Sequence, residues 1–253
     1  MTGETQLAFI LGPVVSYFIG SIPFAYIVAR VFGGLDIRQH GSGNVGATNV
    51  ARVMGWRYGV PVFLLDALKG FLPAYLAIKY FGLSPVHPLV ILCGAGAVLG
   101  HVFPIYLRFK GGKAAATSVG VFLVLAPKAI LGAILVWCII VAVTRYISLG
   151  TIFGAIALCA LFVYFHPDPF GDGRYLMGVS VIIALLIILR HKENIGRLIA
   201  GTEPKVDKGV LPHSRELTLL LLLAFGLTVC VVLVYFWALF GVAGDGEHLT
   251  QCT

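Results

Sequence analysis

The sequence carries little charge for its length. Only 11% of its 253 residues are Asp, Glu, Lys or Arg, whereas 59% are hydrophobic and the mean hydropathy is +0.97. A soluble domain carries roughly 25% charged residues, so this chain has too few polar side chains to cover a water-facing surface. No polar stretch is long enough to hold a second core. The sequence therefore predicts an all-α, polytopic membrane protein embedded in a lipid bilayer.

Metal-binding and nucleic-acid-binding patterns are also missing. The five cysteines include no CxxC pair, and four of them lie in apolar runs, which argues against a disulfide framework or a zinc site. The net charge of +7 comes from basic residues between apolar runs, without a nucleic-acid-binding motif. We expect packing cysteines, no bound metal and no nucleic-acid partner.

Apolar runs of about 20 residues predict the membrane helices. The apolar run of residues 114–143 is too long for one upright span, and we expect Pro127 to divide it into a short helix and a longer one. The other predicted spans are 7–29, 60–80, 88–107, 149–165, 175–189 and 217–240. These spans predict a seven-helix core in residues 1–206 and an extension, residues 207–253, with one additional C-terminal transmembrane helix.

Basic residues between the spans predict the orientation. With the N-terminus outside, one face collects fourteen Lys and Arg, the other only Lys79, Lys128 and Arg174, and Lys69 lies within a span. Cytoplasmic loops hold the excess of Lys and Arg, so we expect the richer face to be cytoplasmic. Its residues are Arg30, Arg38, Arg52, Arg57, Arg108, Lys110, Lys113, Arg145, Arg190, Lys192, Arg197, Lys205, Lys208 and Arg215.

The first cytoplasmic loop contains the run Gly41-Ser-Gly-Asn-Val-Gly-Ala-Thr-Asn49, which satisfies GxGxxG. A dinucleotide site needs a preceding strand, whereas a membrane helix precedes this run. Glycine N–H groups can still converge on an anion, and a following helix would add its positive end. Uncharged donors stand in the same run at Ser42, Asn44, Thr48 and Asn49. The alternative is a flexible connecting loop.

The second loop runs from His101 to Lys110-Gly-Gly-Lys113. It is not a P-loop, because Leu107 replaces the first glycine and Ala114 replaces the magnesium-binding Ser or Thr. Two lysines around paired glycines nevertheless suit a phosphate at the mouth of a helix. A membrane anchor explains Lys110 more easily than Lys113, and His101 is either a packing residue or part of the site.

The third loop is the run Arg190-His-Lys-Glu-Asn194, followed by Glu203. At helical spacing His191 and Asn194 share a face with Leu198. A stop-transfer cluster is the alternative, and it explains Lys192. Since all three loops fall on one membrane face, together they indicate a phosphate-binding site.

Two ionisable residues, Asp66 and Lys69, lie three positions apart inside the second span. Ionisable groups at membrane depth are costly and are usually paired or functional. We expect a structural ion pair on one helical face.

Two rival functions fit part of the pattern. Acyltransferases that use acyl-CoA or acyl carrier protein commonly carry His-x4-Asp, and no histidine here has an aspartate five residues on. An anion channel or transporter would have inverted repeats and polar groups at midplane, whereas the polar groups here gather at one face.

The three loops and the run Ser21-Ile-Pro-Phe make residues 21–205 resemble the acyl-phosphate:glycerol-3-phosphate acyltransferase family, PlsY. The resemblance implies a bacterial cytoplasmic (inner) membrane protein with its active site facing the cytoplasm. It also implies acyl transfer from acyl phosphate to the C1 hydroxyl of glycerol 3-phosphate, which gives lysophosphatidic acid in phospholipid synthesis. Neither a metal, CoA nor another cofactor is implied.

The resemblance assigns the site residues. Within the first loop it implies phosphate binding, with Arg52 as a charged clamp, and in the second it implies a phosphate-binding Lys113. The expected catalytic residues are Ser42, Arg52, Lys113 and His191. The expected substrate-binding residues are Gly43, Asn44, Thr48, His101, Gly111, Gly112, Asn194 and Glu203.

Two points stay open at this stage. The family usually has glycine where this chain has Ala114, and a methyl group there restricts the left-handed backbone conformation. The proton released in acyl transfer could go to His191, to His101 or to the phosphate of the donor, and the resemblance favours the donor phosphate.

Overall fold

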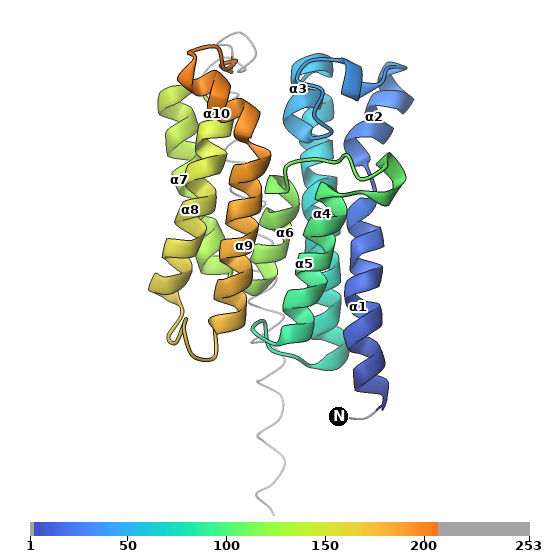
Figure 1. Ribbon diagram of the computed structural model, residues 1–253, viewed down its shortest axis with the longest axis vertical. Helices are drawn as coiled ribbons and strands as arrows, with labels where there is room; N and C mark the ends of the chain where they lie inside the picture. Colours follow the sequence, from blue (N-terminus) through green and yellow to red (C-terminus); the bar gives the residue numbers. More distant parts are fainter. Residues whose placement is uncertain (1–2, 207–253) are drawn as a thin grey trace, which may run out of the picture. The chain divides into compact units, whose positions relative to one another are not determined.

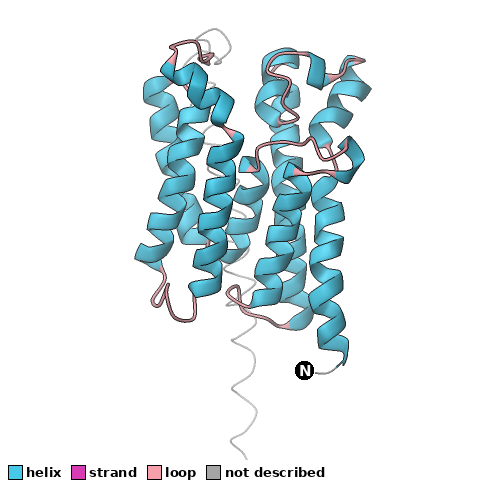
Figure 2. Cartoon of the chain, viewed as in Figure 1, coloured by secondary structure: helices cyan, strands magenta, loops and turns pink. Residues whose placement is uncertain are grey.

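A computed structural model describes residues 3–206, and this part of the chain is helical without strands (Figures 1 and 2), which confirms the predicted all-α fold. The chain divides into two units, Met1–Lys205 and Val206–Thr253, and the described helices lie in the first. The helices are α1 Gly3–Ser21, α2 Phe24–Gly33, α3 Ala47–Met54, α4 Trp56–Phe81, α5 Pro88–Val102, α6 Ala115–Leu125, α7 Pro127–Thr144, α8 Ile147–Phe165, α9 Arg174–Arg190 and α10 Lys192–Ile199. Short 3-10 helices occupy Ile37–Gln39 and Ile105–Leu107.

Within residues 3–206, five segments are long and apolar enough to cross a membrane, or six if α9 and α10, bent by 55°, count as one span. Helix α6 has only 11 residues, a length of about 16 Å, well short of a bilayer core of about 30 Å. The count of seven core spans therefore stays a prediction. The additional span at 217–240 lies outside the described residues.

The first predicted span, 7–29, is apolar throughout but is not one helix. Helix α1 ends at Ser21 and α2 begins at Phe24, because Pro23 has no N–H to continue the ladder. The carbonyl of Ile22 at this break accepts a hydrogen bond from Lys69 Nζ at 2.8 Å. The predicted break between α6 and α7 is confirmed, with Pro127 as the first residue of α7.

Small residues bring neighbouring helix backbones into contact. A Cβ atom on Gly20 of α1 would overlap the carbonyl of Ala97 on α5, and one on Gly120 of α6 would overlap the carbonyl of Ala67 on α4. Close approach at small residues is a common way for membrane helices to pack. These contacts hold α5 against α1 and α6 against α4. The second loop connects α5 to α6.

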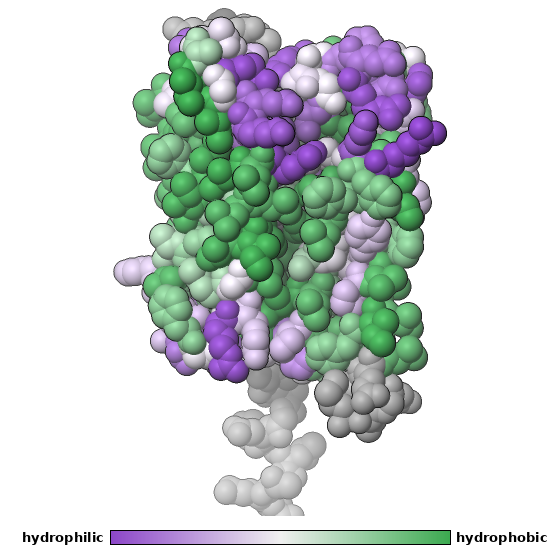
Figure 3. All heavy atoms as spheres, viewed as in Figure 1, coloured by the Kyte–Doolittle hydropathy of each residue, from purple (hydrophilic) through white to green (hydrophobic). Residues whose placement is uncertain are grey.

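Polar and apolar surfaces are separated along the helix axes. Figure 3 shows hydrophilic side chains gathered at the end where α2, α3 and α10 lie, above a hydrophobic band. Large apolar side chains remain exposed on the membrane-length helices and on α9, among them Leu64, Leu135 and Ile182. Lipid contact accounts for such a surface. Figure 1 also shows the loop between α5 and α6 set deeper than the outer ends of α3 and α10.

Candidate active site

Asn49 organises the first loop from inside. Its side-chain amide donates to the carbonyls of Ile37, His40 and Asn44 at 3.2, 3.0 and 3.0 Å, and its oxygen accepts the N–H of Ser42 at 2.8 Å. The residue is 1% exposed. The expectation that Asn49 offers a free donor to an anion is therefore wrong, because its hydrogen-bonding capacity is spent on the loop.

The groups left open in this loop are at its surface. Ser42 and Thr48 are exposed, and Gly43 adopts a left-handed backbone with φ of 69° that closes a turn onto His40. The following helix predicted by the sequence is α3, which begins after Gly46. Arg52 lies in its last turn, exposed, with no polar partner in residues 3–206. Hydroxyls, a helix N-terminus and a free guanidinium thus stand on one short segment.

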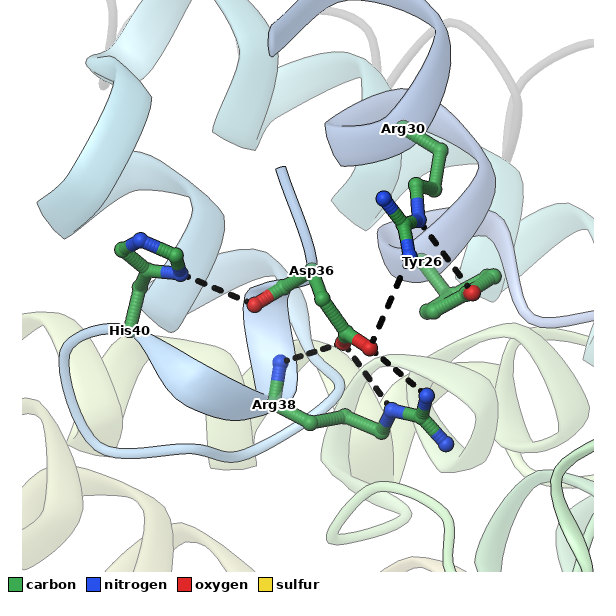
Figure 4. Close-up of polar contacts among 5 residues, drawn as sticks. All are labelled: Tyr26, Arg30, Asp36, Arg38 and His40. Atoms are coloured by element: carbon green, nitrogen blue, oxygen red, sulfur yellow. Dashed lines mark hydrogen bonds and ion pairs between the residues drawn. The ribbon is translucent and has the colours of Figure 1, made fainter. Parts of the chain in front are cut away.

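A compact ion-pair cluster fixes the start of the same loop (Figure 4). The buried carboxylate of Asp36 accepts the N–H, Nε and Nη2 of Arg38 at 3.0, 2.9 and 2.6 Å, and Arg30 lies 4.0 Å away. Hydrogen bonding to Arg38 lowers the pKa of Asp36 to about 2. His40 Nδ1 lies 2.9 Å from the Asp36 carbonyl. Asp36 therefore anchors the chain just before the run of glycines.

The second loop folds back on the end of α5. The N–H of Gly111 donates to the carbonyl of Val102 at 3.2 Å, and that of Gly112 donates to the carbonyl of His101 at 3.1 Å. A side chain on Gly112 would overlap the imidazole of His101. The paired glycines thus let the loop lie against His101, and their own N–H groups are already used.

Arg190, at the end of α9, holds the other side of this loop. Its Nη2 donates to the carbonyl of Gly111 at 2.9 Å and its Nε to that of Gly112 at 3.2 Å. The sequence marked Arg190 only as part of a basic cluster. In the structure it links the second and third loops directly.

Ala114 adopts the left-handed backbone conformation that a methyl group restricts. Its φ is 70° and its ψ is −16°, and its methyl group is fully buried. The left-handed region costs a residue with a Cβ about 1 kcal/mol or more. Ala114, the residue just before α6, therefore carries backbone strain.

Lys113 lies at the meeting point of the second and third loops. Its Nζ donates to the side-chain oxygen of Asn194, and the Asn194 amide donates to Glu203 at 2.6 Å. Burial, and then the neighbouring Arg197, lowers the pKa of Lys113 to about 8. Lys113 is therefore a cation that is held in place and loses its proton as the pH rises through about 8.

Glu203 is the buried acceptor on which the hydrogen bonds of this network converge. It is 7% exposed and also accepts hydrogen bonds from Ser148 at 2.8 Å and Arg197 at 2.7 Å. Burial tends to raise the pKa of Glu203, but the hydrogen bonds from Asn194, Ser148 and Arg197 outweigh it and lower the pKa. The sequence analysis missed Ser148, which stands in no distinctive motif, and it placed Arg197 only among the basic residues of the cytoplasmic face.

His191 lies at the bend between α9 and α10 and is buried. Its Nδ1 lies 2.8 Å from the carbonyl of Ile187. A carbonyl only accepts, so Nδ1 carries the proton and Nε2 is left as an acceptor. His101, by contrast, has Nδ1 at 3.6 Å from Asp66 Oδ1 and its ring against Gly112.

The three loops do not all meet in the same way. Hydrogen bonds join the second loop to the third through Lys113 and Arg190. The first loop approaches the second at a small pocket whose lining includes Val45, His101, Gly111 and Gly112. In residues 3–206, no group of three or more His, Cys, Asp or Glu could hold a metal ion.

Comparisons with known proteins point in one direction. Residues 10–201 match the family described as glycerol-3-phosphate acyltransferase. Curated proteins of that name are 46% identical over 190 residues in Trichlorobacter lovleyi and 42% identical over 199 residues in Fusobacterium nucleatum. These alignments cover 75% and 79% of this chain, and 93% and 98% of the relatives.

Two solved structures are similar as well. They are described as the glycerol 3-phosphate and lysophosphatidic acid forms of PlsY, an integral membrane glycerol 3-phosphate acyltransferase. The first is 41% identical with a TM-score of 0.71 and the second 39% identical with a TM-score of 0.70. They cover 81% and 83% of this chain, and 96% and 99% of the known chains.

Proposed function

The chain belongs to the glycerol-3-phosphate acyltransferase family, and we propose that it takes the acyl group from acyl phosphate. The reaction forms an ester between the acyl carbon and the C1 oxygen of glycerol 3-phosphate. It breaks the bond from the acyl carbon to the phosphate oxygen, giving lysophosphatidic acid and phosphate.

The observation that carries the proposal is the fixed position of Lys113. Hydrogen bonds from Lys113 through Asn194 to the buried Glu203 hold one ammonium group at the junction of two loops. Acyl phosphate is a mixed anhydride with a good leaving group, so no covalent enzyme intermediate is needed. The protein has to hold two anionic phosphates close together and aim a hydroxyl at the acyl carbon. Orientation of this kind can supply roughly 7 to 11 kcal/mol of the barrier.

We assign the phosphate contacts to two groups of residues. Lys113 and Asn194, next to Gly111 and Gly112, bind one phosphate at the junction. The second phosphate binds to the hydroxyls of Ser42 and Thr48, the amide of Asn44 and the guanidinium of Arg52, on the segment that turns at Gly43. Arg suits two-point phosphate binding, whereas Lys acts as a point charge.

For the proton we propose the donor phosphate as the final acceptor. The proton leaves the C1 hydroxyl and ends on a phosphate oxygen, so the phosphate departs as hydrogen phosphate and the charges balance. Nε2 of His191, the acceptor nitrogen, orients that hydroxyl by a hydrogen bond. His101 is less suited to be the base, because both sides of its ring face protein groups, Asp66 and Gly112.

The excess of Lys and Arg on the site face supports a place in the bacterial cytoplasmic membrane with the site facing the cytoplasm. We assign residues 1–206 to the acyltransferase domain and residues 207–253 to an extension. The partners of the protein are then glycerol 3-phosphate, acyl phosphate and the bilayer.

The test is acyl transfer to labelled glycerol 3-phosphate by the purified full chain in detergent. Acyl phosphate, acyl-CoA and acyl carrier protein are offered separately. We expect lysophosphatidic acid from acyl phosphate alone. Product from acyl-CoA or acyl carrier protein alone would overturn the donor assignment, and no product from any donor would reopen the transporter alternative.

A further inference from the structure

A buried charged cluster lies beneath the second loop, and the proposed reaction does not use it directly. Lys69 Nζ lies 2.7 Å from Asp66 Oδ1, which confirms the ion pair predicted from their spacing, and His101 Nδ1 lies 3.6 Å from the same oxygen. The three side chains are 3%, 2% and 7% exposed. Replacing a buried ion pair with apolar residues is often neutral or stabilising. Stability alone therefore does not account for charges at this depth.

At one end of the cluster, Lys69 contacts the backbone at the break between α1 and α2. Lys69 Nζ donates to the carbonyl of Ile22 at 2.8 Å. Pro23 follows and α2 begins at Phe24, so Lys69 binds the backbone where the chain turns from α1 into α2. Helix α2 leads directly to the loop that contains Ser42 and Thr48. The direction of α2, and with it the start of that loop, thus depends on this contact.

At the other end of the cluster, His101 packs against Gly112, the residue before Lys113. The imidazole of His101 fills the space that a side chain on Gly112 would occupy, and the His101 carbonyl accepts the Gly112 N–H at 3.1 Å. Asp66, which faces both His101 and Lys69, lies between the two supported segments. A chain of contacts therefore runs from Ile22 to Gly112.

The same residues border the place where the first and second loops approach each other. The small pocket there is lined by Ile22, Val45, Asp66, His101 and Gly112, among others. Val45 belongs to the first loop and Gly112 to the second. A change in the cluster would alter the separation of the two loops rather than only the packing of α4.

We propose that Asp66 and Lys69 are positioning residues that hold the two phosphate-binding loops at their working separation, Lys69 through Ile22 and Asp66 through His101. The proposal rests on the proposed function, in which one loop binds each phosphate. Neither residue touches substrate. Both act on the geometry of groups that do.

The test variant is Asp66→Asn combined with Lys69→Met. Removing both charges leaves neither one buried without a partner, so the double variant is expected to fold. It loses the hydrogen bond to Ile22 and the charge that faces His101. A misplacement of about 1 Å can cost on the order of 100-fold in rate. We expect kcat to fall 10- to 100-fold, and KM for glycerol 3-phosphate to rise, without a matching loss of thermal stability.

The matched control is Lys79→Met, at the exposed far end of the same helix, which should keep the wild-type rate. If the double variant does not fold, Asp66→Glu replaces it, because this change keeps the charge pair and shifts the carboxylate by about one bond length. A folded variant of either kind with kcat and KM within twofold of wild type would overturn the proposal.

A second readout does not depend on the reaction. Hydrogen–deuterium exchange should increase in residues 108–114 and 20–25 of the double variant, and not in Lys79→Met. If the wild type used no acyl phosphate, the proposed function would fail while this measurement still tested the positioning role. Unchanged exchange in both segments would refute that role.

Discussion

The charge on Lys113 gives a sharp prediction for the pH dependence of the reaction. Burial, with a smaller contribution from Arg197, lowers the pKa of Lys113 from 10.5 to about 8, although Glu203 opposes the shift. A lysine of this pKa is charged below pH 8 and neutral above it. The ammonium that we assign to phosphate binding is therefore present at pH 7 and is lost as the pH rises through 8.

The size of the effect follows from that pKa. About nine in ten copies of Lys113 are charged at pH 7 and about one in ten at pH 9, so kcat/KM for glycerol 3-phosphate should fall roughly tenfold. The ratio kcat/KM reports the ionisation of the free enzyme. Phosphate esters have a second pKa of about 6, so the substrate stays ionised across this range.

Stability should change in the opposite direction. Because the folded pKa of Lys113 is below its unfolded value, the unfolded chain holds that proton more tightly between about pH 8 and 10.5. The Lys113 contribution then favours the folded chain as the pH rises through this window. Loss of activity above pH 8 therefore cannot come from unfolding driven by this residue.

The assay is initial rates from pH 6.5 to 9.5 with acyl phosphate as donor, for the wild type and for Lys113→Arg. Arginine stays charged throughout, so the lower rate of Lys113→Arg should not change with pH over this range. A wild-type profile that is flat from pH 7 to 9 would refute the reasoning. The same inflection in Lys113→Arg would assign it to another group.

Substitutions at three further positions test the local geometry. Ala114→Gly should change the free energy of unfolding by less than about 1 kcal/mol, because relief of left-handed strain offsets the loss of one buried methyl group; Ala114→Val should lower the thermal midpoint. Gly120→Ala should cost about 1 to 3 kcal/mol, since its Cβ would overlap the Ala67 carbonyl, and an unchanged thermal midpoint would contradict the packing. Asn49→Ala removes four hydrogen bonds, each worth about 1 kcal/mol net, and should raise KM for glycerol 3-phosphate more than tenfold in steady-state kinetics.

Much of the fold was predictable because apolar runs and prolines are local signals. Pro127 gave the correct break between α6 and α7. Pro23 carried the same signal for α1 and α2, but the apolar run around it concealed the break. The short length of α6 was also predicted, since only 13 residues lie between Lys113 and Pro127.

The site was less predictable because its contacts are distant in the sequence. Asn49 looked like a free donor, and only its burial beneath the loop shows that its amide is used. Ser148 and Glu203 are 55 residues apart, and a lone serine in an apolar helix is not distinctive. The sequence places Arg190 only in a basic run, and its contacts with Gly111 and Gly112 are visible only in the structure.

The most direct test of the central claim compares two lysines of one loop. Lys113→Ala and Lys110→Ala remove the same charge three residues apart, but only Lys113 contacts Asn194, whereas Lys110 is exposed. With acyl phosphate and glycerol 3-phosphate, Lys113→Ala should lose at least roughly 100-fold in kcat/KM, on the order of 3 kcal/mol, while Lys110→Ala stays near the wild type. Equal losses in the two variants would contradict the assignment of the site to Lys113.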